Sequence, residues 1–561
     1  MKDASYHQHD HHGHSHESYK VSTKITKTDV LIMLVLFTLS CAVKFPTINY
    51  PLSGDASVYA ELTKNLYQHQ SYAINGVFHT VYPFLFPMLS VPLMLFTDNV
   101  IALKLASFFW SSLAVVLLYL LARRLSFDKK LATITALLLL FNPWFFYFTA
   151  TFPLSESLAT VLIMLAYFTY DFDTHYSSSS SKESSQKASL LSALFFAAAI
   201  LTRYTAAIFL IPIAVVKAIE ILNAKNWKNK NGNNNIIKNN FLFLIIAMLP
   251  PLLWIVLTFL KTQNFATHSY FGIFVNQNPI TISLLINNAI KIIFIAPFLL
   301  LLGLILFSFL TLSYFLKYRN MDKEHYFTKS TIWHYVLASY LLNLVIAIIW
   351  FSLYPKNFVH IWEQLRFFVP FLPFMILFSM LSANIVYKKY KMALNKVFTI
   401  IFSAILIISI IATFYVNYGF VKDNADRMFQ VREFFVQKAY HQEQAIDFIN
   451  DQLENKEDEN MQTDDMVIIL LSQQTIRDRQ DIQFKNYFES NNLYDLNQSP
   501  NPQFVFPSGV NQVYREYYIY SEFNQEETEL ALKNKNIQFS ALNQLKTYGR
   551  TSKITIFQLI Q

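Results

Sequence analysis

Two carboxylates in this chain lie where a membrane-associated reaction could use them. Asp55 follows the first apolar segment, within Ser53-Gly54-Asp55-Ala56, and Glu156 follows the third, within Leu154-Ser155-Glu156-Ser157. A carboxylate held at a membrane–water boundary can accept a proton from an attacking hydroxyl group. Both residues also suit the start of a helix, where Asp caps the backbone and the helix dipole favours Glu. The sequence therefore predicts either a pair of catalytic acids or two helix caps.

Two arginines accompany these acids at the ends of later apolar segments. Arg203 follows the fifth segment, and Arg366 precedes the tenth. A guanidinium forms paired, charge-assisted hydrogen bonds to phosphate, so the two residues are candidates for a phosphate clamp. The alternative is that each side chain only extends to the membrane interface. Together, the acids and arginines would hold a phosphate and activate a nucleophile.

The composition is that of a polytopic helical membrane protein. Of 561 residues, 53% are hydrophobic and 15% are charged, and the apolar residues form long runs. The net charge of +8 comes from cations in short loops, so it does not indicate nucleic-acid binding. Cys41 is the single cysteine, which excludes a disulfide framework. The first apolar run has no small-residue cleavage site and is expected to remain as a helix.

Eleven apolar segments are long enough to be candidate membrane spans. They cover residues 30–46, 100–122, 131–149, 154–170, 188–202, 204–221, 241–260, 289–316, 331–351, 367–387 and 397–416. With an inner N-terminus, the lysine-rich short loops all fall on the inner side. The outer loops then hold only Lys64, Arg203, Lys261, Lys356 and Arg366. This orientation places both acids and both arginines at the outer face.

The first outer loop, residues 47–99, is expected to contain structure of its own. The apolar run 81–96 includes three prolines and would invert all later loops if it crossed the membrane, so it is expected to be interfacial or re-entrant. Residues 56–67 carry Tyr59, Leu62 and Leu66 on one helical face, which is typical of a helix on a membrane surface.

Three domains are predicted. Residues 1–28 form a cytoplasmic tail with a histidine-rich tract, residues 29–418 form the transmembrane module, and residues 419–561 form an extracytoplasmic α/β domain. That last domain should have strands at 466–471, 517–520 and 553–559 and a helix at 526–535. Residues 177–181 and the Asn-rich stretch 226–240 are expected to be loops. The tract of His7, His9, His11, His12, His14 and His16 resembles a metal-binding sequence, but no span has regular metal-ligand spacing.

The chain resembles the GT-C membrane glycosyltransferases of the dolichyl-phosphate-mannose–protein mannosyltransferase and lipid A aminoarabinose transferase type. The motifs that carry the resemblance occur in one order: GDASVY at 54–59, YPFLFP at 82–87, LSESL at 154–158, LTRYT at 201–205 and LRFFVPFLP at 365–373. The resemblance covers about residues 30–380. It departs where many lipid A transferases have Lys-Pro-Pro, because this chain has Val81-Tyr82-Pro83 there and so lacks that Lys. It also departs where many mannosyltransferases have Asp-Glu, because Ala56 follows Asp55.

The resemblance implies an inverting glycosyltransferase that uses a sugar on a polyprenyl phosphate, either dolichyl or undecaprenyl. No cofactor is expected, and because a glycosyl phosphate already carries a good leaving group, no metal is required in principle. It makes Asp55 the catalytic base and Glu156 its assistant. The substrate-binding candidates are Arg203, Arg366, Tyr59, Tyr82 and His79. The acceptor would be a protein or a glycolipid on the outer or lumenal face of a membrane, most simply a prokaryotic plasma membrane. The absence of a phosphate-cradling Gly-rich loop argues against a nucleotide-bound donor.

Two other classes of protein also fit parts of the sequence. The histidine-rich tail suggests a polytopic transporter, although transporters place ionisable residues near the bilayer midplane, whereas these lie at helix ends. A non-catalytic lipid-binding scaffold with an outer interaction domain is the other alternative.

Overall fold

A computed structural model gives the fold of most of the helical part of the chain. It describes residues 25–262 with short gaps, then 332–353, 365–389 and 395–414, and separate strands and a helix between 445 and 560. The histidine-rich tail and the predicted span 289–316 lie outside the described residues.

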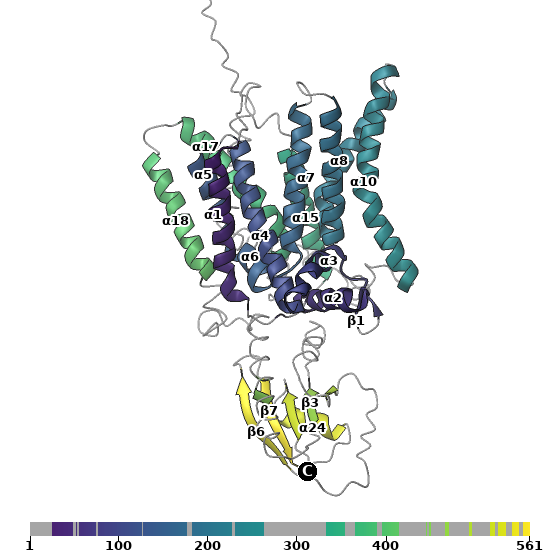
Figure 1. Cartoon of the computed structure of the whole chain (residues 1–561), viewed down its shortest axis with the longest axis vertical. Coiled ribbons are helices and arrows are strands. Elements are labelled where there is room, and N and C mark those ends of the chain that lie inside the picture. Colours follow the sequence, from purple (N-terminus) through teal and green to yellow (C-terminus); the bar gives the residue numbers. More distant parts are fainter. Residues whose placement is uncertain are drawn as a thin grey trace, which may run out of the picture.

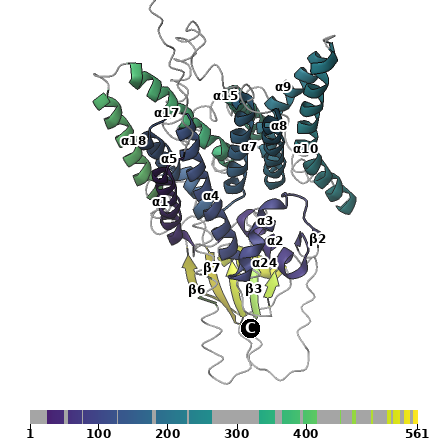
Figure 2. The ribbon, with the colours of Figure 1, turned by 45° about the horizontal axis from the view of Figure 1, so that its top comes forward.

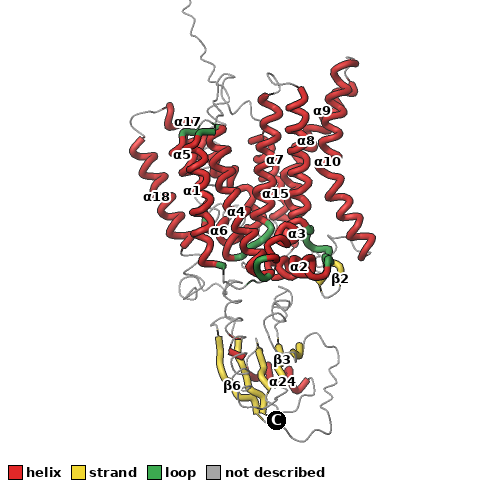
Figure 3. The backbone as a smooth tube through the Cα atoms, viewed as in Figure 1, coloured by secondary structure: helices red, strands yellow, loops and turns green. Residues whose placement is uncertain are grey.

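The helices run side by side in one bundle (Figures 1 and 3). The long helices are α1 (Lys27–Lys44), α4 (Asn99–Arg124), α7 (Glu156–Tyr176), α8 (Lys182–Thr202), α9 (Ala207–Asn226), α10 (Lys230–Thr262), α15 (Ile332–Leu353), α17 (Leu372–Lys389) and α18 (Asn395–Phe414). Each corresponds to a segment predicted from apolar content. The Asn-rich stretch 226–240 was expected to be a loop, but α10 begins within it, at Lys230.

Several helices have the length and hydropathy of membrane spans. Among the described residues four pass both criteria, and a fifth does so if a bent pair is counted as one span. Helix α10 exposes a row of large apolar side chains, which is costly in water and favourable in lipid. The row comprises Leu249, Leu252, Leu253, Val256, Leu257 and Leu260, each 47% to 62% exposed. The described part of the chain therefore has the architecture of a polytopic membrane protein.

The predicted span 131–149 is broken rather than continuous. Helix α5 (Lys129–Leu140) is followed by α6 (Pro143–Phe146) and by a π-helical turn over Tyr147–Thr151, and the two halves are bent by 56°. The break has a local cause, because the side-chain oxygen of Asn142 accepts hydrogen bonds from the backbone N–H groups of Trp144 and Phe145. Pro143 has no N–H of its own and fits the first helical position.

The segment between α1 and α4 forms a cap on one end of the bundle. It contains α2 (Asp55–His69), the short hairpin of β1 (Ala73–Ile74) and β2 (Val77–Phe78), α3 (Leu85–Ser90) and a 3-10 helix over Val91–Leu95. Helix α2 lies across the ends of the long helices (Figure 2). The helix expected over residues 56–67 is present, and the run 81–96 forms helices that are too short to cross a membrane. We call this end of the molecule the α2 end.

Two lysines that lie inside apolar helices are fully buried near the α2 end. Lys44, at the end of α1, donates hydrogen bonds to the hydroxyls of Ser40 and Ser111 at 2.8 and 2.6 Å. Lys104, on α4, donates to the backbone carbonyls of Thr47 and Ile48 at 3.0 and 2.7 Å. Lys104 therefore fixes the chain just before it enters the segment that leads to Asp55.

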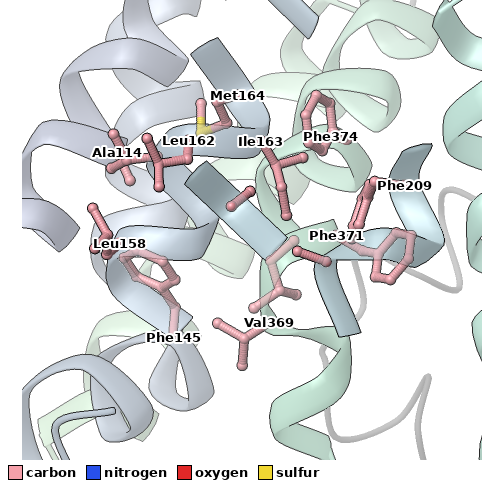
Figure 4. Packing of buried hydrophobic residues seen from close by; sticks show 14 of the residues in the cluster. Ala114, Phe145, Leu158, Leu162, Ile163, Met164, Phe209, Val369, Phe371 and Phe374 are labelled. Atoms are coloured by element: carbon pink, nitrogen blue, oxygen red, sulfur yellow. The ribbon is translucent and has the colours of Figure 1, made fainter. Parts of the chain in front are cut away.

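The core of the bundle is rich in aromatic residues. Phe145, Leu158 and Ile163 pack inside it without exposure, and Phe371 and Phe209 stack with ring centroids 4.1 Å apart (Figure 4). Phe371 ends a 3-10 helix, η5 (Leu365–Phe371), which precedes α17. The tenth predicted span therefore begins as a 3-10 helix, because Pro370 and Pro373 each lack a backbone donor. This packing fixes η5 against α7 and α9.

The C-terminal part contains a five-stranded mixed sheet in the order β4-β3-β5-β7-β6. The strands are β3 (Met466–Leu470), β4 (Leu493–Asp495), β5 (Tyr517–Ser521), β6 (Ala541–Tyr548) and β7 (Ile554–Ile560), and helix α24 spans Gln525–Asn534. Strand β3 pairs in parallel with β4 and β5, whereas β7 pairs antiparallel with β5 and β6. Three strands and the helix were predicted. Strands β4 and β6 were missed; the apolar residues of β6, ALNQLKTY, do not alternate strictly with polar ones as in a half-buried strand.

Candidate active site

Asp55 is the first residue of α2, and both of its carboxylate oxygens are engaged. Tyr82 donates its hydroxyl to Oδ1 at 2.5 Å, and Arg366 donates from Nη1 to Oδ2 at 2.5 Å. Burial alone would raise the pKa of Asp55, but the charge of Arg366 and the two hydrogen bonds outweigh burial, so the pKa lies below its usual value. The carboxylate is therefore ionised at neutral pH and is used in tertiary contacts rather than as a simple helix cap.

Glu156 is the first residue of α7 and is fully buried. Its Oε1 lies 2.7 Å from Nη1 of Arg203, which is itself 9% exposed. Arg203 also donates from Nε to the hydroxyl of Thr205 at 3.0 Å. In the described part of the chain Oε2 of Glu156 has no hydrogen-bond partner. Because a buried charge needs a partner, the ion pair with Arg203 accounts for the placement of Glu156.

The two acid–arginine pairs belong to one site. The guanidinium of Arg203 also contributes to lowering the pKa of Asp55, although its ion pair is with Glu156. The ring of Phe367 lies against both arginines, with its centroid 4.9 Å from the guanidinium carbon of Arg203 and 5.4 Å from that of Arg366. The four charged residues, predicted from the sequence to lie at one face, are therefore brought together by four separate segments of the chain.

The predicted residues of the first loop gather around Tyr82, which contacts Asp55. The rings of Tyr59 and His79 lie 4.9 and 5.2 Å from the ring of Tyr82. The hydroxyl of Tyr59 is 3.0 Å from that of Ser155, the residue that precedes Glu156. Burial raises the pKa of the Tyr59 phenol, so it remains neutral. Tyr59 thus links the segment of Asp55 to that of Glu156.

Sequence reasoning missed two contributors to this site. Ser155 was quoted in a motif without a role, and Phe367 is one of 53 phenylalanines in the chain, so its type alone gave no signal. Its position next to Arg366 was the only clue that the sequence offered. Tyr82 was predicted to bind substrate, and in the structure its hydroxyl donates to Oδ1 of Asp55.

The arrangement combines an ionised base with two cationic groups in a partly dehydrated setting. The side chains of Asp55 and Arg366 are 22% and 16% exposed, so a ligand can still reach them. Two negative and two positive charges leave the site neutral overall. Among the described residues no group of three or more His, Cys, Asp or Glu side chains could hold a metal ion. Such a site suits a reaction in which a hydroxyl loses a proton while a phosphate departs.

Comparison of folds defines the class of protein. The chain superimposes on the crystal structure of ArnT from Cupriavidus metallidurans in the apo state, with a TM-score of 0.52 and 12% identity, over 95% of this chain and 98% of that one. The same enzyme bound to undecaprenyl phosphate gives a TM-score of 0.51, 12% identity, and coverage of 95% and 97%. The TM-scores and coverages show a shared fold, and at identities this low they show the fold alone. The protein is therefore a membrane protein with the fold of a GT-C glycosyltransferase.

The sequence comparison agrees with the fold. The model of the family described as dolichyl-phosphate-mannose-protein mannosyltransferase matches residues 80–254. The archaeal oligosaccharyltransferase AglB from Archaeoglobus fulgidus is a more distant structural neighbour, with a TM-score of 0.43, 13% identity, and coverage of 82% of this chain and 64% of that one. Comparison with curated protein sequences gives no match. The resemblance to GT-C glycosyltransferases of the mannosyltransferase and ArnT kind is thus confirmed.

Proposed function

We propose that this protein is an integral-membrane glycosyltransferase that moves a sugar from a polyprenyl phosphate to a hydroxyl group of a protein or lipid acceptor, with inversion at the anomeric carbon. The observation that carries the proposal is the convergence of Asp55–Arg366 and Glu156–Arg203 in one site at the α2 end. The similar fold of ArnT bound to undecaprenyl phosphate supports a lipid-linked phosphate as donor.

The location of the site explains why such a donor is suitable. A polyprenyl phosphate sugar has a chain that must stay in the hydrocarbon and a head that must stay outside it. The site lies where α2 crosses the ends of the apolar helices. At this position the phosphate and sugar would meet charged side chains while the polyprenyl chain remains among apolar helix faces.

The reaction is a single displacement. The acceptor hydroxyl loses its proton to Asp55 as its oxygen forms a bond to the anomeric carbon. The bond from that carbon to the phosphate oxygen breaks, and its electron pair leaves with the polyprenyl phosphate. Arg203 and Arg366 stabilise the negative charge that grows on the departing phosphate. Glu156 keeps the guanidinium of Arg203 oriented toward the site.

The arginines can serve the donor without first losing their acids. Each guanidinium has five N–H donors, and the two ion pairs use Nη1 of Arg366 for Asp55 and Nη1 of Arg203 for Glu156. The positive charge of both guanidiniums attracts a phosphate that approaches the site. As it does so, it competes with Asp55 for the charge of Arg366. Donor binding therefore weakens the ion pair between Arg366 and Asp55 and makes the Asp55 carboxylate a better proton acceptor.

Purified protein offered defined donors provides the test. We expect transfer from an undecaprenyl or dolichyl phosphate sugar to peptide or glycolipid acceptors and no transfer from nucleotide sugars. The Asp55→Asn variant serves as the inactive control. Turnover with a nucleotide sugar alone would refute the proposal. Comparing peptide with glycolipid acceptors identifies the acceptor class.

The proposal includes an orientation. We infer an inner N-terminus, an outer α2 end and an outer domain at 419–561, because the short lysine-rich loops fall on one side. Single cysteines introduced at Ser180 and Asn460, in a background where Cys41 is replaced by Ser, can be labelled with an impermeant reagent in intact cells. We expect label at position 460 and none at 180. Label at both positions in intact cells would contradict the orientation. Label at neither position in intact cells, with both labelled only after permeabilisation, would contradict it as well.

A further inference from the structure

The segment that carries Arg366 also carries an aromatic ring shared by both arginines. The centroid of the Phe367 ring lies 4.9 Å from the guanidinium carbon of Arg203 and 5.4 Å from that of Arg366. These distances are within the range in which a cation is attracted by the face of an aromatic ring. The two arginines lie 163 residues apart in sequence, and the ring of Phe367 contacts the guanidinium of each.

The position of this ring is itself fixed by the bundle. The backbone carbonyl of Phe367 accepts a hydrogen bond from the side-chain amide of Asn343, on α15, at 3.4 Å. The next residue, Phe368, is 1% exposed and packs its ring 5.7 Å from that of Tyr340, also on α15. The contacts with α15 therefore fix the backbone at Phe367, while its ring lies against the two arginines.

The ring of Phe367 can set the distance between the two neighbouring guanidiniums. Guanidiniums repel each other, and long side chains lose rotamer freedom when a ligand immobilises them. Glu156 and Thr205 restrain Arg203, and Asp55 restrains Arg366, yet none of these contacts sets the spacing between the two guanidiniums. A ring that attracts both of them sets this spacing before a phosphate arrives.

We propose that Phe367 is a positioning residue, whose ring holds the guanidiniums of Arg203 and Arg366 at the spacing required to contact one phosphate group of the donor. This inference rests on the proposed function, since it assigns the arginines to a phosphate. The simpler role of filling space in the core predicts a different response to substitution, because a leucine fills space but has no ring face.

The test compares three variants. Phe367→Leu removes the ring and keeps apolar bulk, Phe367→Tyr keeps the ring, and Phe196→Leu perturbs a buried core ring elsewhere, which lies against Tyr167 and Phe243. The measurements are the Kd of undecaprenyl phosphate, which binds without reacting, the KM and kcat with a defined polyprenyl phosphate sugar, and the thermal midpoint of the purified protein.

We expect Phe367→Leu to weaken undecaprenyl phosphate binding about 5- to 30-fold, the effect of losing preorganisation of two side chains, and to raise the donor KM by a similar factor. Phe367→Tyr should bind within about threefold of the parent. Phe196→Leu should lower the thermal midpoint because it empties part of the core, yet leave the Kd within about threefold of the parent.

A double-mutant cycle shows whether the ring acts through an arginine. If it does, Phe367→Leu must cost less affinity in an Arg366→Gln background than in the parent, because one of its two cations is already missing. Equal losses in the two backgrounds, or a loss in Phe367→Leu that Phe367→Tyr does not restore, would overturn the inference. If the parent binds undecaprenyl phosphate and Phe367→Leu binds it equally well, the inference alone fails. If the parent binds no polyprenyl phosphate, the proposed function fails, and the inference fails with it.

Discussion

Replacing Asp55 with Asn separates the role of the carboxylate as a base from its role in holding the site together. The substitution keeps the size of the side chain and one acceptor oxygen but removes the charge. Asn cannot accept a proton from the acceptor hydroxyl at neutral pH. General base catalysis contributes about 10²- to 10⁴-fold in rate, so kcat should fall by at least about 100-fold.

The stability cost can be estimated from the contacts of Asp55. The carboxylate accepts one hydrogen bond from Tyr82 and one from Arg366, and a hydrogen bond to a charged group is worth about 1.5–3 kcal/mol. Asn can keep one of these two bonds. The side chains of the ion pair are 22% and 16% exposed, so water screens part of the lost charge interaction. We therefore expect a loss of about 2 kcal/mol of unfolding free energy, more than loss of a helix cap alone would cause.

Donor binding should respond in the opposite direction to turnover. Without the carboxylate, Arg366 has no acid to neutralise it at this position and is more available to phosphate. Asp55→Asn should therefore bind undecaprenyl phosphate at least as tightly as the parent while turning over slowly. Single-turnover transfer from a labelled polyprenyl phosphate sugar measures the rate, and direct binding of undecaprenyl phosphate measures the affinity.

Asp98→Asn is a matched control for this experiment. Asp98 caps α4 by accepting a hydrogen bond from the backbone N–H of Ile101 at 2.8 Å, and Asn caps helices about as well as Asp. This variant should keep normal rate, affinity and stability. Near-normal turnover in Asp55→Asn would show that Asp55 is structural and that the base lies elsewhere. Loss of both turnover and donor binding would show that the site has collapsed, and the rate loss could then not be assigned to a missing base.

Three further predictions follow from other contacts. Glu156→Gln leaves Arg203 buried without its acid, so it should cost about 3 kcal/mol of stability by thermal or chemical unfolding and slow transfer less than Asp55→Asn does. Arg366→Gln removes the main charge that depresses the pKa of Asp55. Because the active form is the ionised one, the acid side of the pH profile of kcat/KM should lie at higher pH in the variant than in the parent. A profile that does not move would exclude Asp55 as the titrating base. Lys104→Met leaves two backbone carbonyls without their donor and should destabilise the protein by about 2 kcal/mol, and unchanged stability would show that water replaces the lysine.

Much of the helical architecture is predictable because the membrane imposes one strong rule. Long apolar segments such as α4 and α10 must become helices, since every backbone group has to be paired within its own segment. The break after α5 was missed even though Asn142-Pro143 is a recognisable helix start, because a hydropathy window averages over such a pair. Buried Lys44 and Lys104 escaped notice for the same reason.

The site was predictable in its members but not in its contacts. Topology placed Asp55, Glu156, Arg203 and Arg366 at one end of the molecule. It could not show that Arg366 would pair with Asp55, 311 residues away, because that contact depends on how η5 packs against the bundle. It also could not distinguish Phe367 from other phenylalanines.

The two guanidiniums of the site also affect the end of the catalytic cycle. Under the proposed function the donor enters as a phosphodiester with a single negative charge, and it leaves as a polyprenyl phosphate monoester that carries between one and two charges near neutral pH, its second pKa being about 6. The same two guanidiniums therefore attract the product more strongly than the substrate. Departure of the spent lipid is then the slow step, and the first turnover should appear as a burst followed by a slower steady rate that added polyprenyl phosphate reduces further.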